Sequence, residues 1–206
     1  IHSVDSGLYS FPPGLQEHHV ICPPADKPLV LLYLLQHYVK KQALCFTSSI
    51  ETNHRLYTLL RLMGTDCVEE YSASLPQVER DALLRRFQAG QVKMLICSDV
   101  MARGLDISDV SAVVNYDPPH FLRNYVHRVG RTARAGREGS SYTLLRPDDM
   151  RHFKEMMKKA EAPAKAVKKI VIQGPSLAPY MKSYKENLEK LKDELAMEKS
   201  KKRARQ

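Results

Sequence analysis

The chain has 206 residues, of which 43% are hydrophobic, and it contains no apolar run long enough to span a membrane. Its formal net charge of +9 is unevenly placed, because residues 1–150 hold 16 basic and 16 acidic side chains whereas residues 151–206 hold 16 and 7. A basic C-terminal segment favours binding to nucleic acid or an acidic partner, although it can also serve solubility alone. We recognise no secretory signal, and because the chain begins with Ile1 we expect a fragment, a processed form or an expressed piece of a longer protein.

Strands and helices are predicted to alternate along residues 16–160. A strand at 16–22 is followed by a helix over 29–39 and a short apolar strand at 43–46. Ser48 and Glu51 have the spacing of a capping box, which predicts that a helix begins there and ends near Gly64. The cycle then repeats, with strands at 67–71, 93–98, 112–116 and 140–145 and helices at 76–89, 121–129 and 148–160.

This alternation predicts an α/β fold with an open, mostly parallel sheet and helices on both of its faces. In such sheets ligands bind beyond the carboxyl ends of the strands, so a site is expected in the loops after Phe46, Tyr71, Ser98, Tyr116 and Leu145. The four cysteines lie in apolar runs without a CxxC pair, which favours small buried side chains over a disulfide or a zinc site.

The two ends of the chain differ from this central part. We expect a linker at residues 1–14, one α/β domain at 15–160 and a basic extension at 161–206. Within the extension, 161–175 is predicted to be irregular, 176–199 to be a helix and the basic end after residue 199 to be disordered. The helix has an apolar stripe formed by Tyr180, Tyr184, Leu188, Leu191 and Leu195. The extension could therefore act as an RNA anchor, or it could pack on the domain or on a protein partner.

The strongest chemical signal is the sequence His127-Arg-Val-Gly-Arg-Thr-Ala-Arg134, which has three arginines in eight residues and opens where a predicted helix ends. Arginine is permanently charged and can hold a phosphate through two parallel hydrogen bonds. Such a cluster is electrostatically costly unless an anion offsets it. The alternative is a solvated basic loop, or arginines paired with Asp99, Asp106 or Asp117.

Three further loops carry polar groups at the expected edge of the sheet. In residues 98–106, Ser98 could bind a phosphate oxygen and Gly104 allows a close backbone approach. Asp106 could accept hydrogen bonds from a ribose. The alternative is that this stretch begins a helix, with Ser98 or Asp99 as its cap. Arg80, at the end of Gln77-Val-Glu-Arg80, could reach a nucleic-acid phosphate or be an ordinary exposed charge. The stretch Phe46-Thr-Ser-Ser49 could line a phosphate or provide a helix cap.

In this order, the four stretches resemble the C-terminal RecA-like lobe of DEAD-box RNA helicases over roughly residues 15–150. Residues 95–107 look like motif V of that family, and His127 stands where many related helicase families, including those that act on DNA, carry Gln. By resemblance, His127 contacts the other lobe, Arg131 and Arg134 reach the γ-phosphate of ATP, and Asp106 binds the ATP ribose. The residues implied along the RNA backbone are Ser49, Gln77, Arg80, Ser98, Arg103 and Gly104.

The sequence departs from the family pattern at three places. Ser72-Ala73 replaces the frequent His-Gly, Ser98 replaces the more frequent Thr, and Ala133 replaces a common Gly. The first change puts the details of RNA contact in doubt, but none of the three removes an arginine or the carboxylate of Asp106.

The chain has no G-x-x-x-x-G-K-[ST] loop and no Asp-Glu-Ala-Asp sequence, which the family places on an N-terminal lobe. The resemblance therefore implies that ATP and magnesium are bound mainly by that other lobe, and that this chain alone is inactive. It implies RNA and the N-terminal lobe as partners, and no membrane. The basic tail is similar to those of nucleolar helicases, which suggests ribosomal RNA precursors and ribosome assembly factors as further partners, with a nuclear import signal near Lys201. The alternative is a non-catalytic RNA-binding or scaffold module.

Overall fold

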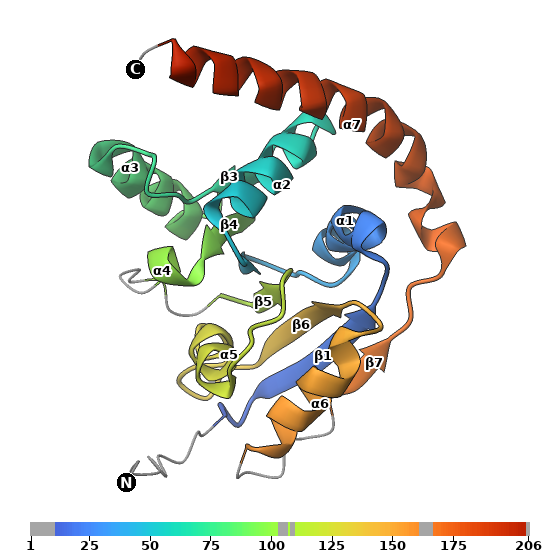
Figure 1. Cartoon of the computed structure of the whole chain (residues 1–206). Helices are drawn as coiled ribbons and strands as arrows, with labels where there is room; N and C mark the ends of the chain where they lie inside the picture. The colour runs from blue at the N-terminus through green and yellow to red at the C-terminus, as the bar shows by residue number, and fades with distance from the viewer. Residues whose placement is uncertain (1–10, 103–106, 108–109, 161–166, 205–206) are drawn as a thin grey trace, which may run out of the picture.

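The computed structural model describes residues 11–102, 107, 110–160 and 167–204, and its centre is a parallel sheet of seven strands (Figure 1). The order across the sheet is β3-β4-β2-β5-β6-β1-β7, and every strand pair is parallel. The predicted α/β class is thereby confirmed. The strands are β1 (Leu15–Ile21), β2 (Ala43–Thr47), β3 (Val68–Glu70), β4 (Met94–Ser98), β5 (Ala112–Asn115), β6 (Gly139–Leu145) and β7 (Lys168–Ile170).

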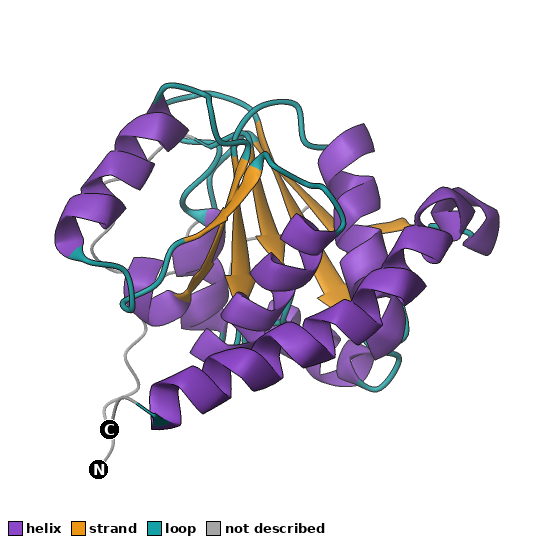
Figure 2. Ribbon diagram, turned by 90° about the horizontal axis from the view of Figure 1, so that it is seen from above, coloured by secondary structure: helices purple, strands orange, loops and turns teal. Residues whose placement is uncertain are grey.

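The helices form a layer on each face of the sheet (Figure 2). One face is covered by α1 (Lys27–His37), α2 (Ile50–Leu62) and α7 (Gly174–Arg203). The other face is covered by α3 (Gln77–Gln88), α4 (Asp99–Ala102), α5 (Leu122–Val129) and α6 (Asp149–Lys158). A short 3-10 helix, η1 (Pro24–Asp26), leads into α1.

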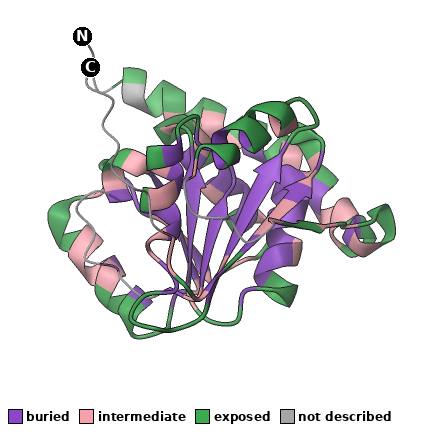
Figure 3. Cartoon of the chain, turned by 90° about the horizontal axis from the view of Figure 1, so that it is seen from below, coloured by how far each residue is buried: buried purple, intermediate pink, exposed green. Residues whose placement is uncertain are grey.

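Alternate residues of each central strand enter the cores on opposite faces, which is the geometry of a strand covered on both sides. In β2, Ala43 and Cys45 join the core under α1 and α2, whereas Leu44 and Phe46 join the core under α3. The central strands β2, β4 and β5 are accordingly buried throughout, as Figure 3 shows in purple. This burial explains why the strands are continuous apolar runs in the sequence rather than alternating ones. All four cysteines are free thiols, and only Cys67 is partly exposed.

Two expectations for the C-terminal extension were wrong. Residues 168–170, within the segment expected to be irregular, form β7 and pair with β1 at the edge of the sheet. The helix also continues through the basic end to Arg203, where we expected disorder. Pairing with β1 stabilises β7, whereas the basic end continues a helix whose preceding turn contacts α2 through Glu194 and Glu198, and Lys and Arg are themselves good helix formers.

The apolar stripe of α7 packs on α1 and α2. Tyr184 and Leu191 are buried in the shared core, and Tyr180, Leu188 and Leu195 are partly buried against it. The Tyr184 hydroxyl donates to the carbonyl of Ala25 at 2.6 Å. Packing on the domain, one of the alternatives left open by the sequence, is therefore what this helix does. Among the described residues, no helix combines the length and apolar character needed to cross a membrane.

Candidate functional site

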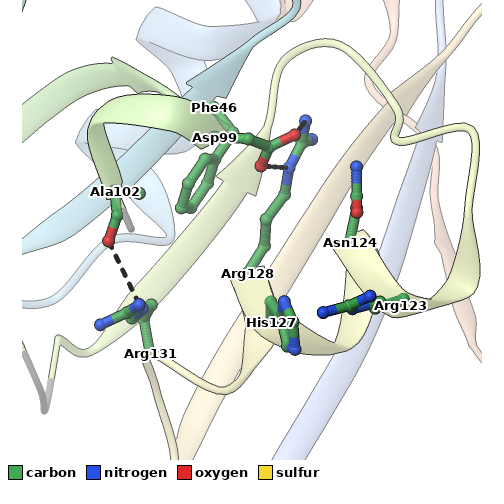
Figure 4. A pocket seen from close by; sticks show the side chains of 8 residues that line it. All are labelled: Phe46, Asp99, Ala102, Arg123, Asn124, His127, Arg128 and Arg131. Atoms are coloured by element: carbon green, nitrogen blue, oxygen red, sulfur yellow. Dashed lines mark hydrogen bonds and ion pairs between the residues drawn. The ribbon is translucent and has the colours of Figure 1, made fainter. Parts of the chain in front are cut away.

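A cavity of about 250 Å³ opens at the carboxyl edge of the sheet, between the loops that follow β2, β4 and β5 (Figure 4). Helix α5 provides one wall, and Phe46 at the end of β2 and the short α4 provide the other. The residues that line it are Phe46, Asp99, Ala102, Arg123, Asn124, His127, Arg128 and Arg131. The structure thus brings the His127–Arg131 stretch together with the residues after Ser98, as expected for ligand-binding loops of a parallel sheet.

Arg128 is the structural centre of this cavity, because its side chain is only 4% exposed and makes four hydrogen bonds. Its Nε and one terminal nitrogen donate to the two carboxylate oxygens of Asp99 at 2.7 and 2.9 Å. The other terminal nitrogen donates to Asn115 Oδ1 at 3.1 Å and to the carbonyl of Asp117 at 2.8 Å. The guanidinium also lies over the Phe46 ring, 5.0 Å from its centroid. Arg128 therefore ties α5 to the ends of β2, β4 and β5, and its bonding capacity is largely used within the protein.

Arg131 projects into the same cavity from the turn after α5, where it donates to the carbonyl of Ala102 at 3.2 Å. Burial and the nearby Arg134 lower the pKa of the Arg131 guanidinium, because both disfavour its charge. Guanidinium groups nevertheless stay charged at neutral pH. An anion placed here would relieve the repulsion between Arg131 and Arg134.

Arg134 lies on the exposed surface of the same turn, and its Nε donates to the carbonyl of Gly130. The turn has unusual backbone geometry, since Ala133 and Ala135 both adopt positive φ, at 56° and 53°. Such angles favour glycine. The positive φ of Ala133 thus explains why the family that this sequence resembles frequently has Gly at this position.

His127 is exposed and lines the cavity from the last turn of α5. Arg123 and Asn124, which sequence reasoning missed, precede His127 and Arg128 by one helical turn each and line the same cavity. Their four-residue spacing from His127 and Arg128 was the signal that could have identified them, because residues four apart share one face of a helix.

The loop after β2 is held by Asp117, which follows β5. The Asp117 carboxylate accepts a hydrogen bond from the backbone amide of Ser48 at 2.8 Å and another from Lys27 Nζ at 3.1 Å. Lys27 is itself buried and also donates to the carbonyl of Tyr116 at 2.8 Å. Asp117 thus fixes the loop that carries Ser48 and Ser49, whereas the sequence suggested it only as a partner for an arginine.

The prediction that Ser48 caps α2 was wrong by one residue. Ser49 occupies the N-cap position, and its Oγ accepts a hydrogen bond from the amide of Thr52 at 3.1 Å. With two adjacent serines, the sequence pattern could not distinguish the two positions. The Ser48 amide is instead engaged by Asp117, so both serines help to order this loop.

The remaining described candidates follow three neighbouring strands. Ser98 ends β4 and lies beside Thr47 of β2 in the sheet register, close to the loop of Ser49. Gln77 and Arg80 open α3, which follows β3, and the Arg80 guanidinium donates to Gln77 Oε1. These four residues therefore share the carboxyl edge of β2, β4 and β3. Arg103, Gly104 and Asp106 lie outside the described residues.

The family described as helicase conserved C-terminal domain matches residues 26–136. The ATP-dependent RNA helicase DDX51 of Homo sapiens is 40% identical over 200 residues, which cover 97% of this chain and 30% of the human protein. The ATP-dependent RNA helicase dbp6 of Schizosaccharomyces pombe is 38% identical over 197 residues, which cover 93% of this chain and 32% of that protein. The chain thus spans about a third of the length of these relatives.

Solved structures show the same fold. The C-terminal domain of the DEAD-box protein Dbp5 superposes with a TM-score of 0.69 at 28% identity, covering 82% of this chain and 96% of that domain. A structure described as Saccharomyces cerevisiae Dbp5 bound to RNA and ADP BeF3 gives a TM-score of 0.67 at 29% identity, covering 85% of this chain and 46% of that one.

Proposed function

Because the chain belongs to the helicase conserved C-terminal domain family and is a homologue of DEAD-box ATP-dependent RNA helicases, we propose that it is the second RecA-like lobe of such an enzyme. In this proposal the lobe closes with an N-terminal lobe on ATP and RNA and thereby opens a short RNA duplex. The observation that carries it is the cavity at the carboxyl edge, where His127 lies on the last turn of α5 and Arg131 on the turn that follows, beside the buried Arg128–Asp99 pair.

The proposed catalytic role of Arg131 and Arg134 is to stabilise charge on the phosphate that is transferred to water. An arginine side chain suits this role because its charge is permanent and its donors are oriented before the reaction begins. Arg131 is half-buried, which strengthens its interaction with an anion, and a lobe that closes over it would exclude more water. We assign His127 to the contact with the other lobe, Asp106 to the ATP ribose, and Arg128 to positioning rather than to the phosphate.

The proposed RNA-binding edge consists of the residues that follow β2, β3 and β4. Ser49, Gln77, Arg80 and Ser98 share this edge, and we assign Arg103 and Gly104 to it from the resemblance alone. Contacts from hydroxyl, amide and arginine groups to phosphates and 2′-hydroxyls bind RNA with little regard for sequence. Ser72-Ala73, which replaces the frequent His-Gly of the family, follows β3 as well, and Ser72 is buried with its Oγ 2.8 Å from Ser74 Oγ.

Magnesium and most of the ATP contacts are proposed to come from the N-terminal lobe, because this sequence contains neither a phosphate-binding loop nor an Asp-Glu-Ala-Asp motif. Magnesium would neutralise phosphate charge there. Among the described residues, no group of three His, Cys, Asp or Glu side chains could hold a metal ion. The chain alone is therefore expected to show no RNA-stimulated ATPase, and a non-catalytic RNA-binding module is the second candidate function.

The experiment that tests the proposal compares variants of the two-lobe protein in a steady-state ATPase assay with saturating RNA. Arg131→Ala should reduce kcat on the order of 10³-fold, as loss of an arginine finger does in other phosphoryl-transfer enzymes, while RNA affinity is retained. Arg151→Ala, which removes an arginine that is 90% exposed on α6, serves as the control and should leave kcat unchanged. Unaltered turnover in Arg131→Ala would reject the proposed role and favour the non-catalytic module.

We further propose that the parent protein acts on ribosomal RNA precursors in the nucleolus, together with ribosome assembly factors. The support is the similarity to DDX51 and dbp6 and the basic end of the chain. Crosslinking of the full-length protein to RNA in cells tests this step. Recovery of ribosomal precursor sequences is the expected result, and recovery of messenger RNA alone would contradict it.

A further inference from the structure

The positive charge of α7 is concentrated at its C-terminal end. Residues 174–198 contain four basic and five acidic side chains, whereas four of the five residues at 199–203 are Lys or Arg. Lys199, Lys201 and Arg203 are all exposed. The long helix therefore presents one short cationic segment, defined here as the basic end (residues 199–203), after a nearly neutral body.

The basic end is fixed in place by a bridge across three elements. His54 of α2 lies between two glutamates, with Nδ1 2.8 Å from Glu70 Oε2 at the end of β3 and Nε2 2.7 Å from Glu198 Oε2 of α7. One turn earlier on α7, Glu194 forms an ion pair with Arg61 of α2. These contacts hold the last turns of α7 against α2 although the outward surface of the helix is charged.

The position of the basic end matters because it lies at the edge proposed to bind RNA. A cavity of about 660 Å³ separates it from α2 and from the turn before α3, and Lys199, Lys201, Ile50 and Ser74 are among the lining residues. Ile50 directly follows Ser49, and Ser74 lies three residues before Gln77. In Figure 1 the helix correspondingly runs over α2 and ends above α3.

The acidic groups that line the cavity are Glu51, Glu70 and Glu198, and its basic groups are Arg55, Lys199 and Lys201. Glu70 and Glu198 share His54 between them, and Glu51 lies in the first turn of α2, where the helix dipole favours a negative charge. Lys199 and Lys201 are exposed, and no ion pair of either with an acidic residue is found among the described residues. Their charge is therefore presented to solvent and to whatever binds along this edge.

We propose that the basic end of α7 extends the RNA-binding edge, so that a single strand leaving Ser49 and Gln77 continues over the cavity and its phosphates meet Lys199 and Lys201. This inference rests on the proposed function, and it gives His54 a positioning role. Exposed Ile50, 52% accessible beside this path, offers an apolar contact for a base. The body of α7 packs on the domain, and only its last turns meet RNA.

The test uses the two-lobe protein and oligo-uridine of about 20 nucleotides, longer than the roughly 4–16 nucleotides that one small single-strand-binding domain covers. The double variant K199Q/K201Q removes two charges and should raise the half-saturating RNA concentration on the order of tenfold. It should also reduce the slope of log K against log salt by about 1.4, because each phosphate contact on a single strand contributes about 0.7.

The matched control is K182Q/K185Q, which removes the same charge from exposed positions of the same helix near α1. Equal salt slopes for wild type and K199Q/K201Q would overturn the inference, and so would an equal effect of both double variants, which would indicate a diffuse field. Capture of an acidic protein by this segment with unaltered RNA binding would likewise overturn it. Absence of RNA-stimulated turnover in the wild-type protein would instead reject the proposed function itself, so the two failures are distinguishable.

His54→Ala provides an independent measurement, because it breaks the bridge without changing Lys199 or Lys201. If the bridge positions the basic end, this variant lowers RNA affinity while Lys199 and Lys201 are still present, and K199Q/K201Q has a smaller additional effect in that background. Full additivity of the two changes would show that His54 does not position the lysines.

Discussion

Asp99 and Arg128 form a two-pronged ion pair, with hydrogen bonds of 2.7 and 2.9 Å, across the base of the cavity that carries His127 and Arg131. The pair joins the residue immediately after β4 to the last turn of α5. Its geometry explains why three arginines can follow one another so closely, since the first is already matched by a carboxylate inside the domain. The other two, Arg131 and Arg134, lie on the turn that follows α5.

Asp99→Ala should lower the free energy of unfolding by about 3 kcal/mol, because it leaves a charged guanidinium buried without its carboxylate. Urea denaturation followed by circular dichroism measures this change. Glu155→Ala is the control, since it breaks the exposed pair of Glu155 with Arg151 and should cost less than about 1 kcal/mol. Similar losses in the two variants would mean that the Asp99–Arg128 pair adds no special stability.

Ala135→Gly should stabilise the protein by up to about 1 kcal/mol, because an L-residue with positive φ is strained and Ala135 is exposed. Ala133→Gly should give a smaller gain, since the methyl group of Ala133 is buried and its removal costs packing. Thermal denaturation measures both changes. A loss of stability in Ala135→Gly would show that the strain at this turn is negligible.

Leu191→Ala should destabilise the domain by about 2–5 kcal/mol, as expected for a leucine that is 0% exposed within a packed core. Met197→Ala, on the same helix at 63% exposure, is the control and should have little effect. Urea titration compares the two. If α7 did not pack on the domain, Leu191→Ala would not change the urea concentration at the midpoint of unfolding.

His54 predicts a pH dependence of stability. Burial lowers the tendency of His54 to take a proton, but its hydrogen bonds to Glu70 and Glu198 outweigh burial and raise its pKa above the ordinary value of 6.5. A raised pKa means that the stabilisation is complete below the pKa of the unfolded chain and is lost as pH rises through the higher pKa of the folded protein.

The measurement is the melting temperature between about pH 6 and pH 9, which spans the titration of a histidine with a raised pKa. The wild-type protein should lose stability with rising pH relative to His54→Gln, which cannot titrate. Parallel curves for the two proteins would show that the bridge contributes no linked proton.

The sequence allowed the prediction of the central strands and their helices because β2, β4 and β5 are apolar runs covered on both faces. It did not allow the prediction of β7, since Lys168-Lys-Ile170 is a short edge strand whose pairing with β1 decides its structure. The helical conformation of the last turns of α7 could not be predicted either, because a run of lysines predicts disorder unless a contact such as that of His54 with Glu198 is known.

For the site, the motif order predicted which loops meet, whereas side-chain burial decided what each arginine does. Only the fold shows that Arg128 is 4% exposed and makes four hydrogen bonds within the protein, whereas Arg134 lies on the surface. Likewise, Arg123 and Asn124 line the cavity because they lie one helical turn before His127 and Arg128 on α5. Burial depends on contacts between residues far apart in the chain, and a motif does not encode them.

The route of α7 across the sheet has a mechanical consequence. β7 forms one edge of the sheet and β3 the other, and α7 runs from beside β7 to the end of β3. Its 30 residues span about 45 Å, more than the roughly 29 Å width of seven strands. A force applied at the end of α7 would therefore load the side-chain contacts of one helix, which can detach turn by turn, before it loads any hydrogen bond of the sheet. A tether or cargo attached there would disturb the docking of α7 while the strands that carry the arginine cluster stay intact.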